Sequence, residues 1–278
     1  MTMIHRLCSV RSALWLASSA VLGSCGIDGL RDRRWDNERV RALQEASISQ
    51  YGERPIAGQS IDEFFRNKVG LIATDGGELP VGRVVPISKD GYYLTAWHVV
   101  ADARFRLSET NVVGNRVQAD EYPGRVVWHD TSADLAIVKF DVRPSVSFKT
   151  RAPLEKGEVV FSGANGRNGG TLVTKPNATG TYNLEESLKA GIGNGPFRTA
   201  GAVTNLSTLN GEPSRIIYES TLVGRGGMSG GPVVNREGYL VGIVTSGHAT
   251  IFSAPKAVFS MIDPVALNSI VQADRSRR

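Results

Sequence analysis

Three short segments carry residue types that could together perform nucleophilic catalysis. The segment "YYLTAWHVVADA" contains His98, "ADLAIVKF" contains Asp134 and "GRGGMSGGPVV" contains Ser229, in that order along the chain. A serine hydroxyl is a weak nucleophile at neutral pH, so it needs a base within hydrogen-bond reach, and imidazole titrates in the useful range. The imidazole in turn needs a carboxylate that orients it and stabilises the imidazolium. The three segments therefore predict a serine, histidine and aspartate that act together.

The glycines around Ser229 predict a second part of the same site. Attack on a carbonyl carbon creates an oxyanion, and the backbone N–H groups that point at it must come from a loop too tight for bulky side chains. Gly230 and Gly231 allow the backbone to approach closely before the next strand. We therefore expect an oxyanion hole formed by the N–H groups of Gly227 and Ser229.

Each of these residues alone is ambiguous, and one rival arrangement has the same local spacing. Glycine-rich turns around a serine are common. The Gly-x-Ser-x-Gly spacing also fits the nucleophile elbow of α/β-hydrolases, where the order along the chain is serine, acid, histidine. Here only His248 follows the serine, with Asp263 beyond it, and crossover helices are missing. The elbow is therefore rejected.

Other polar residues near the three segments are interpreted as structural. Asp102 follows the histidine too closely to reach back across its ring, and Asp130 precedes the strand that presents Asp134, so both are read as surface carboxylates. His129 and His248 have no metal-ligand spacing with other histidines, cysteines or acids. The chain also lacks a phosphate-binding glycine loop. We predict no metal site and no cofactor.

The elements that must position these residues read as strands. Short apolar or alternating runs separated by turn residues fill residues 68–255 and indicate an all-β sandwich or barrel. "SKDG" and "NREG" are predicted hairpin turns, with Asp90-Gly91 supplying the positive φ in the first. Near the end, Asp263 before a proline predicts a helix N-cap. The apolar stripe of this helix is Leu267, Ile270 and Val271.

Taken jointly, "LTAWHVV", "DLAIVKF" and "GMSGGPVV" resemble the chymotrypsin-fold (trypsin-like) serine proteases, and most closely their bacterial periplasmic branch. The likeness extends along "VGRVVPISKDGYYLTAWHVV" and covers about residues 65–260. It implies two six-stranded antiparallel β-barrels of the chymotrypsin type, over residues 61–145 and 146–278, the second with the short terminal helix. No PDZ domain is expected.

The resemblance also implies roles for the three residues. His98 would be the general base and acid, Asp134 the carboxylate that orients it, and Ser229 the acylated nucleophile, in the cleft between the barrels. Met228 stands before the serine where the family often has Asp or Asn, and no Ile-Val-Gly-Gly-type end is visible. Activation by a newly created N-terminus is therefore not expected.

The family's pocket predicts where a substrate side chain would bind. Neither wall contains Asp or Glu, so selection for Lys or Arg is not expected, and we expect a small or medium apolar residue before the cut. In the alternative, Arg225 points inward and favours acidic residues. The predicted walls are Val223, Gly224, Arg225 and Gly226 on one side and Thr245, Ser246 and Gly247 on the other.

The N-terminus reads as an export signal over residues 1–24. Two arginines precede an apolar run at 13–22 that is too short to span a bilayer stably. Its end, "LGSC", resembles a bacterial lipobox, in which Cys25 is acylated and becomes the new N-terminus. Cleavage near Ala20, which would release a soluble protein, is the alternative.

Cysteine usage supports the anchored form. The other cysteine, Cys8, lies inside the signal, so Cys25 would be alone in the mature chain and unable to form an internal disulfide. Residues 25–60 are expected to be a membrane-proximal linker with a short helix. Gly26 after the cysteine favours the periplasmic face of the outer membrane, by resemblance to known sorting rules.

The charge composition of the chain argues against one class of binding partner, nucleic acid. The formal charge of +5 over 278 residues is spread thinly among acidic residues, so no basic face for nucleic acid is expected. The sequence thus predicts an exported, lipid-anchored serine endopeptidase that acts on a protein or peptide substrate. The alternatives are a non-catalytic peptide- or partner-binding module on the same fold, and an esterase or other acyl-transferring hydrolase.

Overall fold

The computed structural model of the protein describes most of the chain from Asn37 onward. The described residues are 37–51, 56–66, 68–74, 82–101, 104–113, 116–151, 153–164, 181–183, 197–209, 212–250 and 253–277. The predicted export signal, the lipidation site Cys25 and the rejected acid Asp102 lie outside these ranges. Within them, no helix combines the length and apolar character needed to cross a membrane.

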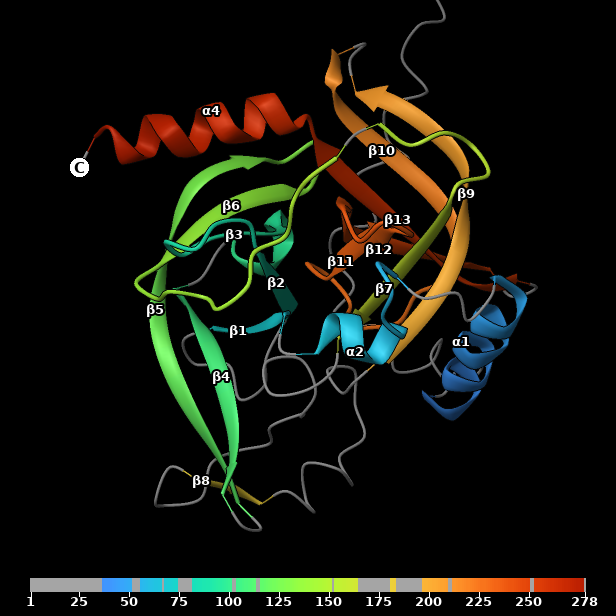
Figure 1. The fold of residues 1–278 in the computed structure, drawn as a ribbon, viewed down its shortest axis with the longest axis horizontal. Coiled ribbons are helices and arrows are strands. Elements are labelled where there is room, and N and C mark those ends of the chain that lie inside the picture. The colour runs from blue at the N-terminus through green and yellow to red at the C-terminus, as the bar shows by residue number, and fades with distance from the viewer. Residues whose placement is uncertain are drawn as a thin grey trace, which may run out of the picture. The chain divides into compact units, whose positions relative to one another are not determined.

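A seven-stranded antiparallel sheet holds the first half of the fold, in the order β4-β1-β2-β3-β6-β5-β8 (Figure 1). Because β4 also pairs with β5, strands β1 to β6 form an unbroken ring of pairings. The strands are β1 (Gly70–Thr74), β2 (Gly82–Pro86), β3 (Tyr92–Ala96), β4 (Phe105–Val113), β5 (Arg116–Asp130), β6 (Leu135–Phe140) and β8 (Thr181–Asn183).

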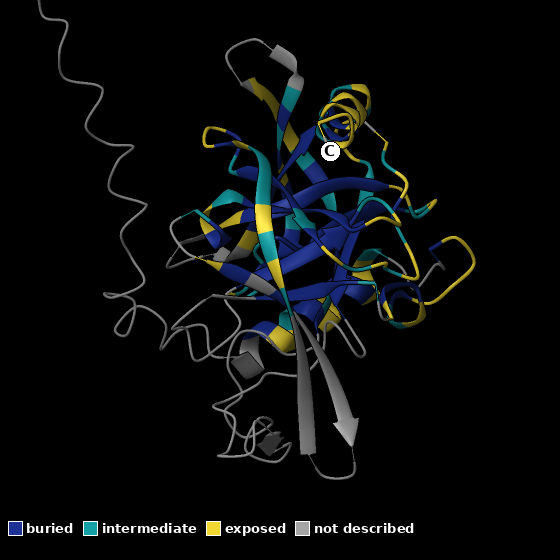
Figure 2. Ribbon diagram, turned by 90° about the vertical axis from the view of Figure 1, so that its left-hand side faces the viewer, coloured by how far each residue is buried: buried dark blue, intermediate teal, exposed yellow. Residues whose placement is uncertain are grey.

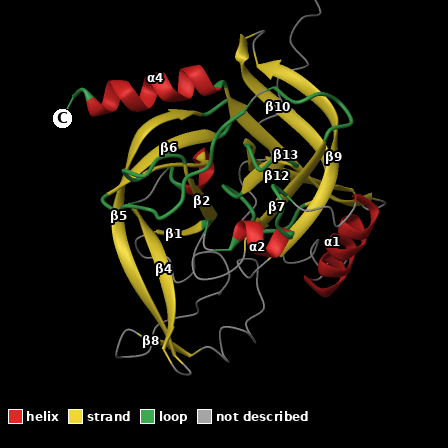
Figure 3. Cartoon of the chain, in the orientation of Figure 1, coloured by secondary structure: helices red, strands yellow, loops and turns green. Residues whose placement is uncertain are grey.

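A closed six-stranded antiparallel barrel forms the second half, in the order β10-β13-β12-β11-β7-β9. The predicted all-β class is confirmed, and Figure 3 shows that strands dominate the structure. The barrel strands are β7 (Val159–Ala164), β9 (Phe197–Leu209), β10 (Glu212–Val223), β11 (Pro232–Asn235), β12 (Leu240–Thr250) and β13 (Ser253–Ile262).

Strand β6 shows why its sequence, "LAIVKF", is apolar almost throughout. Successive side chains of a strand point to opposite faces. Leu135 and Ile137 join the hydrophobic cluster that extends into the second barrel, whereas Ala136 and Val138 join the cluster inside the first sheet. Both faces of β6 are therefore covered by apolar side chains, and Figure 2 shows that buried residues are concentrated in the strands.

The two predicted hairpin turns are present. Gly91, between β2 and β3, has a φ of +89°, and Gly238, between β11 and β12, has a φ of +83°. At Gly91 a side chain would also meet main-chain oxygen, since a Cβ would lie 2.3 Å from the carbonyl oxygen of Phe140. Glycine is required there for both reasons.

The C-terminal helix forms as predicted. Asp263 is its N-cap and accepts hydrogen bonds from the N–H groups of Val265 and Ala266 at 2.9 and 3.1 Å. Leu267 and Val271 are buried. The helices in the described ranges are α1 (Asn37–Tyr51), α2 (Ile61–Phe65), the 3₁₀ helix η3 (Trp97–Val99) and α4 (Pro264–Arg275).

The far end of α4 is attached to the first sheet by charged side chains. Asp274 pairs with Arg125 of β5 and accepts a hydrogen bond from the Tyr92 hydroxyl at 2.8 Å. Arg275 pairs with Asp90, in the turn before β3, at 2.6 Å. The helix thus connects the end of the second barrel with the first sheet.

Helix α1 belongs to the same compact unit as the barrels, which runs from Asn37 to Arg278. It packs against β9, β10 and β13 of the second barrel. Residues 25–60 were predicted to be a linker, and within them the stretch from Asn37 is this docked helix. The predicted division at 145/146 stays a prediction, and β8, which lies beyond that boundary, pairs with β5 of the first sheet.

Candidate active site

His98 and Asp134 are brought together by the register of two neighbouring strands. Ala96, at the end of β3, is the pairing partner of Leu135, at the start of β6. The residue before β6 therefore lies beside the residues that follow β3. His98, in η3, has its ring Nδ1 2.7 Å from Asp134 Oδ2, and its main-chain N–H donates to Asp134 Oδ1 at 2.8 Å.

The backbone of Asp134 is held in an uncommon conformation. Its φ is +51°, in the left-handed region that aspartate tolerates better than most residues. The main-chain N–H of Trp97 donates to the Asp134 carbonyl at 3.0 Å. Three hydrogen bonds to residues 97 and 98 thus hold this turn, and together they set the position of the imidazole.

Ser229 lies in the segment Gly224–Gly231 between β10 and β11, here called the glycine loop. Gly227 and Gly230 have φ values of +81° and +80°. The N–H of Gly230 donates to the Val244 carbonyl at 2.8 Å. A Cβ on Gly230 would lie only 1.9 Å from the Arg83 carbonyl oxygen, so no larger residue fits there without displacing the main chain. The loop is therefore tight, as its sequence predicts.

The first sheet holds the glycine loop through Arg83 of β2. The main-chain N–H of Arg83 donates to the Ser229 carbonyl at 2.8 Å, and its side-chain Nε donates to the Gly227 carbonyl at 3.1 Å. The hydroxyl of Thr95 donates to the Arg83 carbonyl at 2.7 Å. The two halves of the fold are thereby joined at the loop that presents Ser229.

Arg83 is fully buried, and sequence reasoning did not single it out. Burial lowers its pKa to about 9, with a further contribution from the positive charge of Arg225. This value is still above neutral pH, so the guanidinium keeps its charge there. The ring of Phe197 lies 5.2 Å from the Arg83 guanidinium carbon. An arginine inside the otherwise apolar run "GRVVP" was the available signal.

The 3₁₀ helix that carries His98 and the glycine loop both lie beside Gly82 of β2. A Cβ on Gly82 would lie 2.6 Å from Val99 Cγ2 and 3.0 Å from the Ser229 carbonyl oxygen. The segment that carries His98 and the glycine loop thus face the same glycine. Among the described residues, however, neither Ser229 Oγ nor His98 Nε2 has a hydrogen-bond partner. The serine-to-histidine link of the predicted triad is open in this structure.

The N–H groups expected to form the oxyanion hole are available. Within the described part of the chain, no acceptor receives the N–H of Gly227 or of Ser229. The neighbouring N–H of Met228, by contrast, donates to the Arg225 carbonyl at 3.3 Å. The Gly231 N–H donates to the Met228 carbonyl at 2.8 Å. The loop thus uses the amides of Met228, Gly230 and Gly231 and leaves two donors for another acceptor.

The two predicted pocket walls flank one residue of β13. Gly224 lies against Ala257, with a Cβ on it 3.4 Å from the Ala257 nitrogen, and Gly247 is the pairing partner of Ala257. Arg225 is largely buried, and its pKa is lowered to about 10 by burial and by the nearby charge of Arg41. Val223 and Thr245 are also buried, whereas Gly226, Ser246 and Gly247 are exposed.

The alternative acid, Asp130, is buried rather than on the surface as predicted, and its oxygens bond to residues other than His98. Although burial opposes it, hydrogen bonds from Ser132 and from the N–H of Ala133 hold the pKa of Asp130 below its usual value. Asp130 also pairs with Arg215 at 2.9 Å. His129 stacks on Trp97, with ring centroids 3.9 Å apart. No three His, Cys, Asp or Glu residues of the described ranges lie close enough to hold a metal ion.

Comparison with known proteins gives one family profile that matches the chain and solved structures that have a similar fold. A family profile described as the trypsin-like peptidase domain matches residues 82–243, more than half of the chain. The MamO protease domain from Magnetospirillum magneticum has a TM-score of 0.52 and 18% identity, over 74% of this chain and 97% of that one. At this identity the likeness describes the fold alone. No curated protein matches the sequence significantly.

Two further solved structures have lower TM-scores. The HtrA-type protease AlgW with a decapeptide has a TM-score of 0.46 and 20% identity, over 69% of this chain and 52% of that one. The present chain therefore corresponds to about half of AlgW. An inactive form of Rv3671c from M. tuberculosis H37Rv has a TM-score of 0.48 and 20% identity, over 75% of this chain and 88% of that one.

Proposed function

The chain belongs to the trypsin-like peptidase domain family, and from that membership we propose that it is a serine endopeptidase. The family predicted from the sequence is thereby confirmed. The observation that carries the proposal is the pair of hydrogen bonds from His98 to Asp134, one from the ring and one from the main chain. This pair leaves Nε2 of His98 as the nitrogen that acts as base.

We propose the following reaction. Ser229 Oγ attacks the carbonyl carbon of the scissile peptide bond while His98 Nε2 takes the hydroxyl proton. His98 then returns that proton to the leaving amine, which departs and leaves an acyl group on Ser229. A water molecule, deprotonated by the same nitrogen, attacks the acyl carbonyl carbon. The bond from this carbon to Ser229 Oγ then breaks, Oγ takes the proton back from His98, and the carboxylic acid product leaves. Asp134 stays ionised and stabilises the imidazolium in both halves of the reaction.

The N–H groups of Gly227 and Ser229 are proposed to stabilise the oxyanion. Their lack of acceptors in the described ranges supports this role, because preorganised donors need no rearrangement during attack. The open link between Ser229 and His98 must close to about 3 Å when substrate binds, and catalytic hydrogen bonds are often longer in ligand-free structures. Substrate binding would complete the triad.

The same open link favours one competing function. A protease fold whose serine makes no hydrogen bond to its histidine could hold peptides without cutting them. A non-catalytic binding module therefore remains the second candidate.

An esterase on the same fold differs from a peptidase only in the bond that it cleaves. Paired ester and amide substrates with the same acyl group separate esterase activity from peptidase activity.

Labelling by a fluorophosphonate probe tests the proposal. We expect the protein without its signal to be labelled, and the label to be absent from Ser229→Ala and His98→Ala. Ser49→Ala is the matched control, since this exposed serine bonds only within helix α1, to the Glu45 carbonyl. An unlabelled wild-type protein that is folded and binds peptides would support the binding module instead.

Substrate preference is proposed from the predicted pocket walls. They contain no acidic residue, and Arg225 is largely buried against the ring of Phe197, 5.8 Å from its centroid. We propose a small or medium apolar residue before the cut. Cleavage of a peptide library measures this preference, and a dominant Asp or Glu at that position would show that Arg225 faces the substrate.

Location is proposed from the sequence alone. The basic leader, the apolar run and "LGSC" support export and acylation of Cys25, with the protein held at the periplasmic face of the outer membrane. Metabolic labelling with a fatty-acid analogue measures the modification. Label that persists in Cys25→Ala, or wild-type protein recovered without lipid, would overturn this part of the proposal.

A further inference from the structure

Helix α1 contributes a buried amide group to the glycine loop. Gln44 is only 2% exposed, and its Nε2 donates to the Val223 carbonyl at 3.0 Å. The same nitrogen lies 3.7 Å from Met228 Sδ, within hydrogen-bonding range of sulfur. A buried amide is costly unless it is paired. The two contacts therefore give Gln44 a specific position between β10 and the residue that precedes Ser229.

These contacts hold both ends of one stretch of the loop. Val223 is the last residue of β10, and Met228 is the immediate neighbour of Ser229. Met228 is fully buried, while Ser229 is partly exposed. Since adjacent residues share one backbone, a fixed Met228 side chain limits the positions open to Ser229. Gln44 thus acts on the serine through its neighbour.

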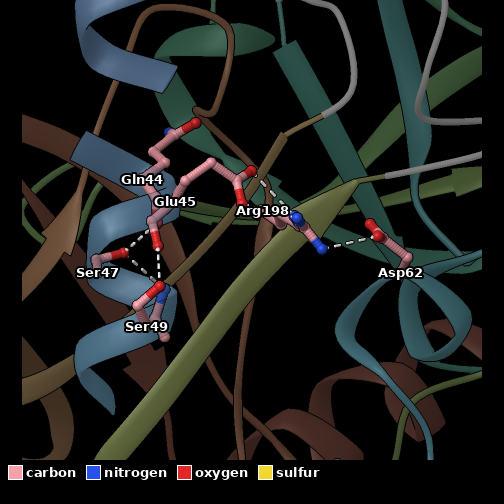
Figure 4. A network of polar contacts seen from close by, with 7 residues as sticks. Gln44, Glu45, Ser47, Ser49, Asp62 and Arg198 are labelled. Atoms are coloured by element: carbon pink, nitrogen blue, oxygen red, sulfur yellow. Dashed lines mark hydrogen bonds and ion pairs between the residues drawn. The ribbon is translucent and has the colours of Figure 1, made fainter. Parts of the chain in front are cut away.

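A polar network attaches the helix at this point, and Figure 4 shows Gln44 and Ser47 on helix α1 within it. Ser47 Oγ donates to the Gln44 carbonyl at 2.7 Å and lies 3.2 Å from Thr199 Oγ1. Thr199 Oγ1 in turn accepts the N–H of Val223 at 3.1 Å. The main chain of Val223 is therefore held on both sides, by Gln44 at its carbonyl and by Thr199 at its N–H.

The loop needs such external support. Five of its eight residues, Gly224, Gly226, Gly227, Gly230 and Gly231, are glycines, which lose more conformational freedom on ordering than other residues. A catalytic side chain must be held within about 0.5 Å of its productive position. Arg83 supplies contacts from the first sheet, and Gln44 supplies them from helix α1, which precedes the matched residues 82–243.

We propose that Gln44 is a positioning residue, which holds the glycine loop in the conformation that Ser229 needs in order to react. The proposal rests on the proposed peptidase function and deepens it. Helix α1, which precedes the family domain in the sequence, is then part of the working catalytic unit. Met228 is the residue through which the helix acts.

The first test compares three variants of helix α1. Gln44→Met keeps much of the volume but removes the N–H donor, and Gln44→Ala removes both. Glu45→Ala is the matched control, because it breaks the ion pair with Arg198, 2.7 Å long, that also holds the helix. We expect kcat to fall about tenfold in both Gln44 variants, with KM within about twofold, as for loss of one buried hydrogen bond. Glu45→Ala should keep kcat within about twofold.

Hydrogen exchange of the full-length folded protein supplies a measurement that does not depend on activity. Peptides that cover the glycine loop should exchange faster in Gln44→Met than in wild type, while peptides from β12 should not change. Unchanged loop exchange in Gln44→Met, or equal acceleration in Glu45→Ala, would overturn the positioning role. If the wild type neither cuts peptides nor reacts with the probe, the proposed function fails, and the exchange result alone then decides the role of Gln44.

Discussion

The side chain of Arg83 donates through Nε to the carbonyl of Gly227 at 3.1 Å, although no part of this arginine is exposed. A charged group in this position is costly to bury, and its lowered pKa, about 9, reflects that cost. The bond reaches the residue whose N–H is proposed to bind the oxyanion. Arg83 therefore links the first sheet to the proposed catalytic loop.

Replacing Arg83 tests this link. We expect Arg83→Met to lower kcat/KM by about tenfold to a hundredfold, because the Gly227 carbonyl loses its hydrogen-bond donor and the glycine loop loses one contact with the first sheet. Arg83→Lys, which keeps a charge but lacks the planar fork, should fall between wild type and Arg83→Met. Peptide hydrolysis and the thermal midpoint are measured together. Full activity in Arg83→Met would mean that the loop is held without this bond.

Two aspartates near the histidine make a matched pair. Asp134→Asn should lower kcat about ten-thousandfold, because the amide favours the wrong imidazole tautomer. Asp130→Asn should keep kcat within about threefold, since Asp130 bonds to Ser132, Ala133 and Arg215 rather than to His98. Steady-state kinetics on one peptide measures both. Equal losses in the two variants would contradict the assignment of Asp134.

Substitution by alanine should destabilise the protein much more at one glycine of the loop than at another. Gly230→Ala should cost about 3 kcal/mol or more of unfolding free energy, because the Cβ would lie 1.9 Å from the Arg83 carbonyl oxygen and φ is +80°. Gly226→Ala should cost less than about 1 kcal/mol, because nothing lies within 4 Å of its Cβ. Urea denaturation gives both values. A stable Gly230→Ala protein would show that the loop can shift away from β2.

Acid should weaken the attachment of α4. A hydrogen bond from Arg275 is the largest cause that lowers the pKa of Asp90, to about 2 from an ordinary value near 3.8. A carboxyl with a lowered pKa in the folded protein stabilises it above pH 3.8, and this stabilisation is lost as pH falls towards 2.

The variant Asp90→Asn lacks this titration. Its thermal midpoint should lie below that of wild type at pH 6, and the gap should shrink between about pH 4 and pH 2. Arg151→Ala serves as the control, since its pair with Glu237 at 3.7 Å joins two exposed side chains, neither of them in α4. A gap of constant size across this pH range would mean that the Asp90 pair does not contribute to stability.

Local features of the sequence were sufficient for several elements. The turns at Gly91 and Gly238 follow from glycine's access to positive φ, and the cap of α4 follows from an aspartate that bonds to the amides of the first turn. The all-β class follows from repeated short apolar runs. Each of these depends on residues within a few positions of one another, so the chemistry of the segment alone determines the outcome.

The pairing of His98 with Asp134 depends partly on the local sequence and partly on the tertiary structure. Sequence could name both residues, through chemistry and through the resemblance of their segments to the peptidase family. The register of β3 with β6 then determined that they meet, with Nδ1 and Oδ2 at 2.7 Å. The link from His98 to Ser229 was expected too, but no hydrogen bond joins these two side chains among the described residues.

Tertiary structure alone decided the roles of Gln44 and Arg83. On the inner face of α1 the buried polar residues Gln44 and Ser47 interrupt the buried apolar residues Val40 and Ile48, so the sequence predicts a short helix within a linker but not its docking. Gln44 meets its partner Val223 across 179 positions, and Arg83 meets Gly227 across 144. These contacts form only when segments far apart in the sequence pack against the glycine loop. No periodicity within one segment can therefore predict them.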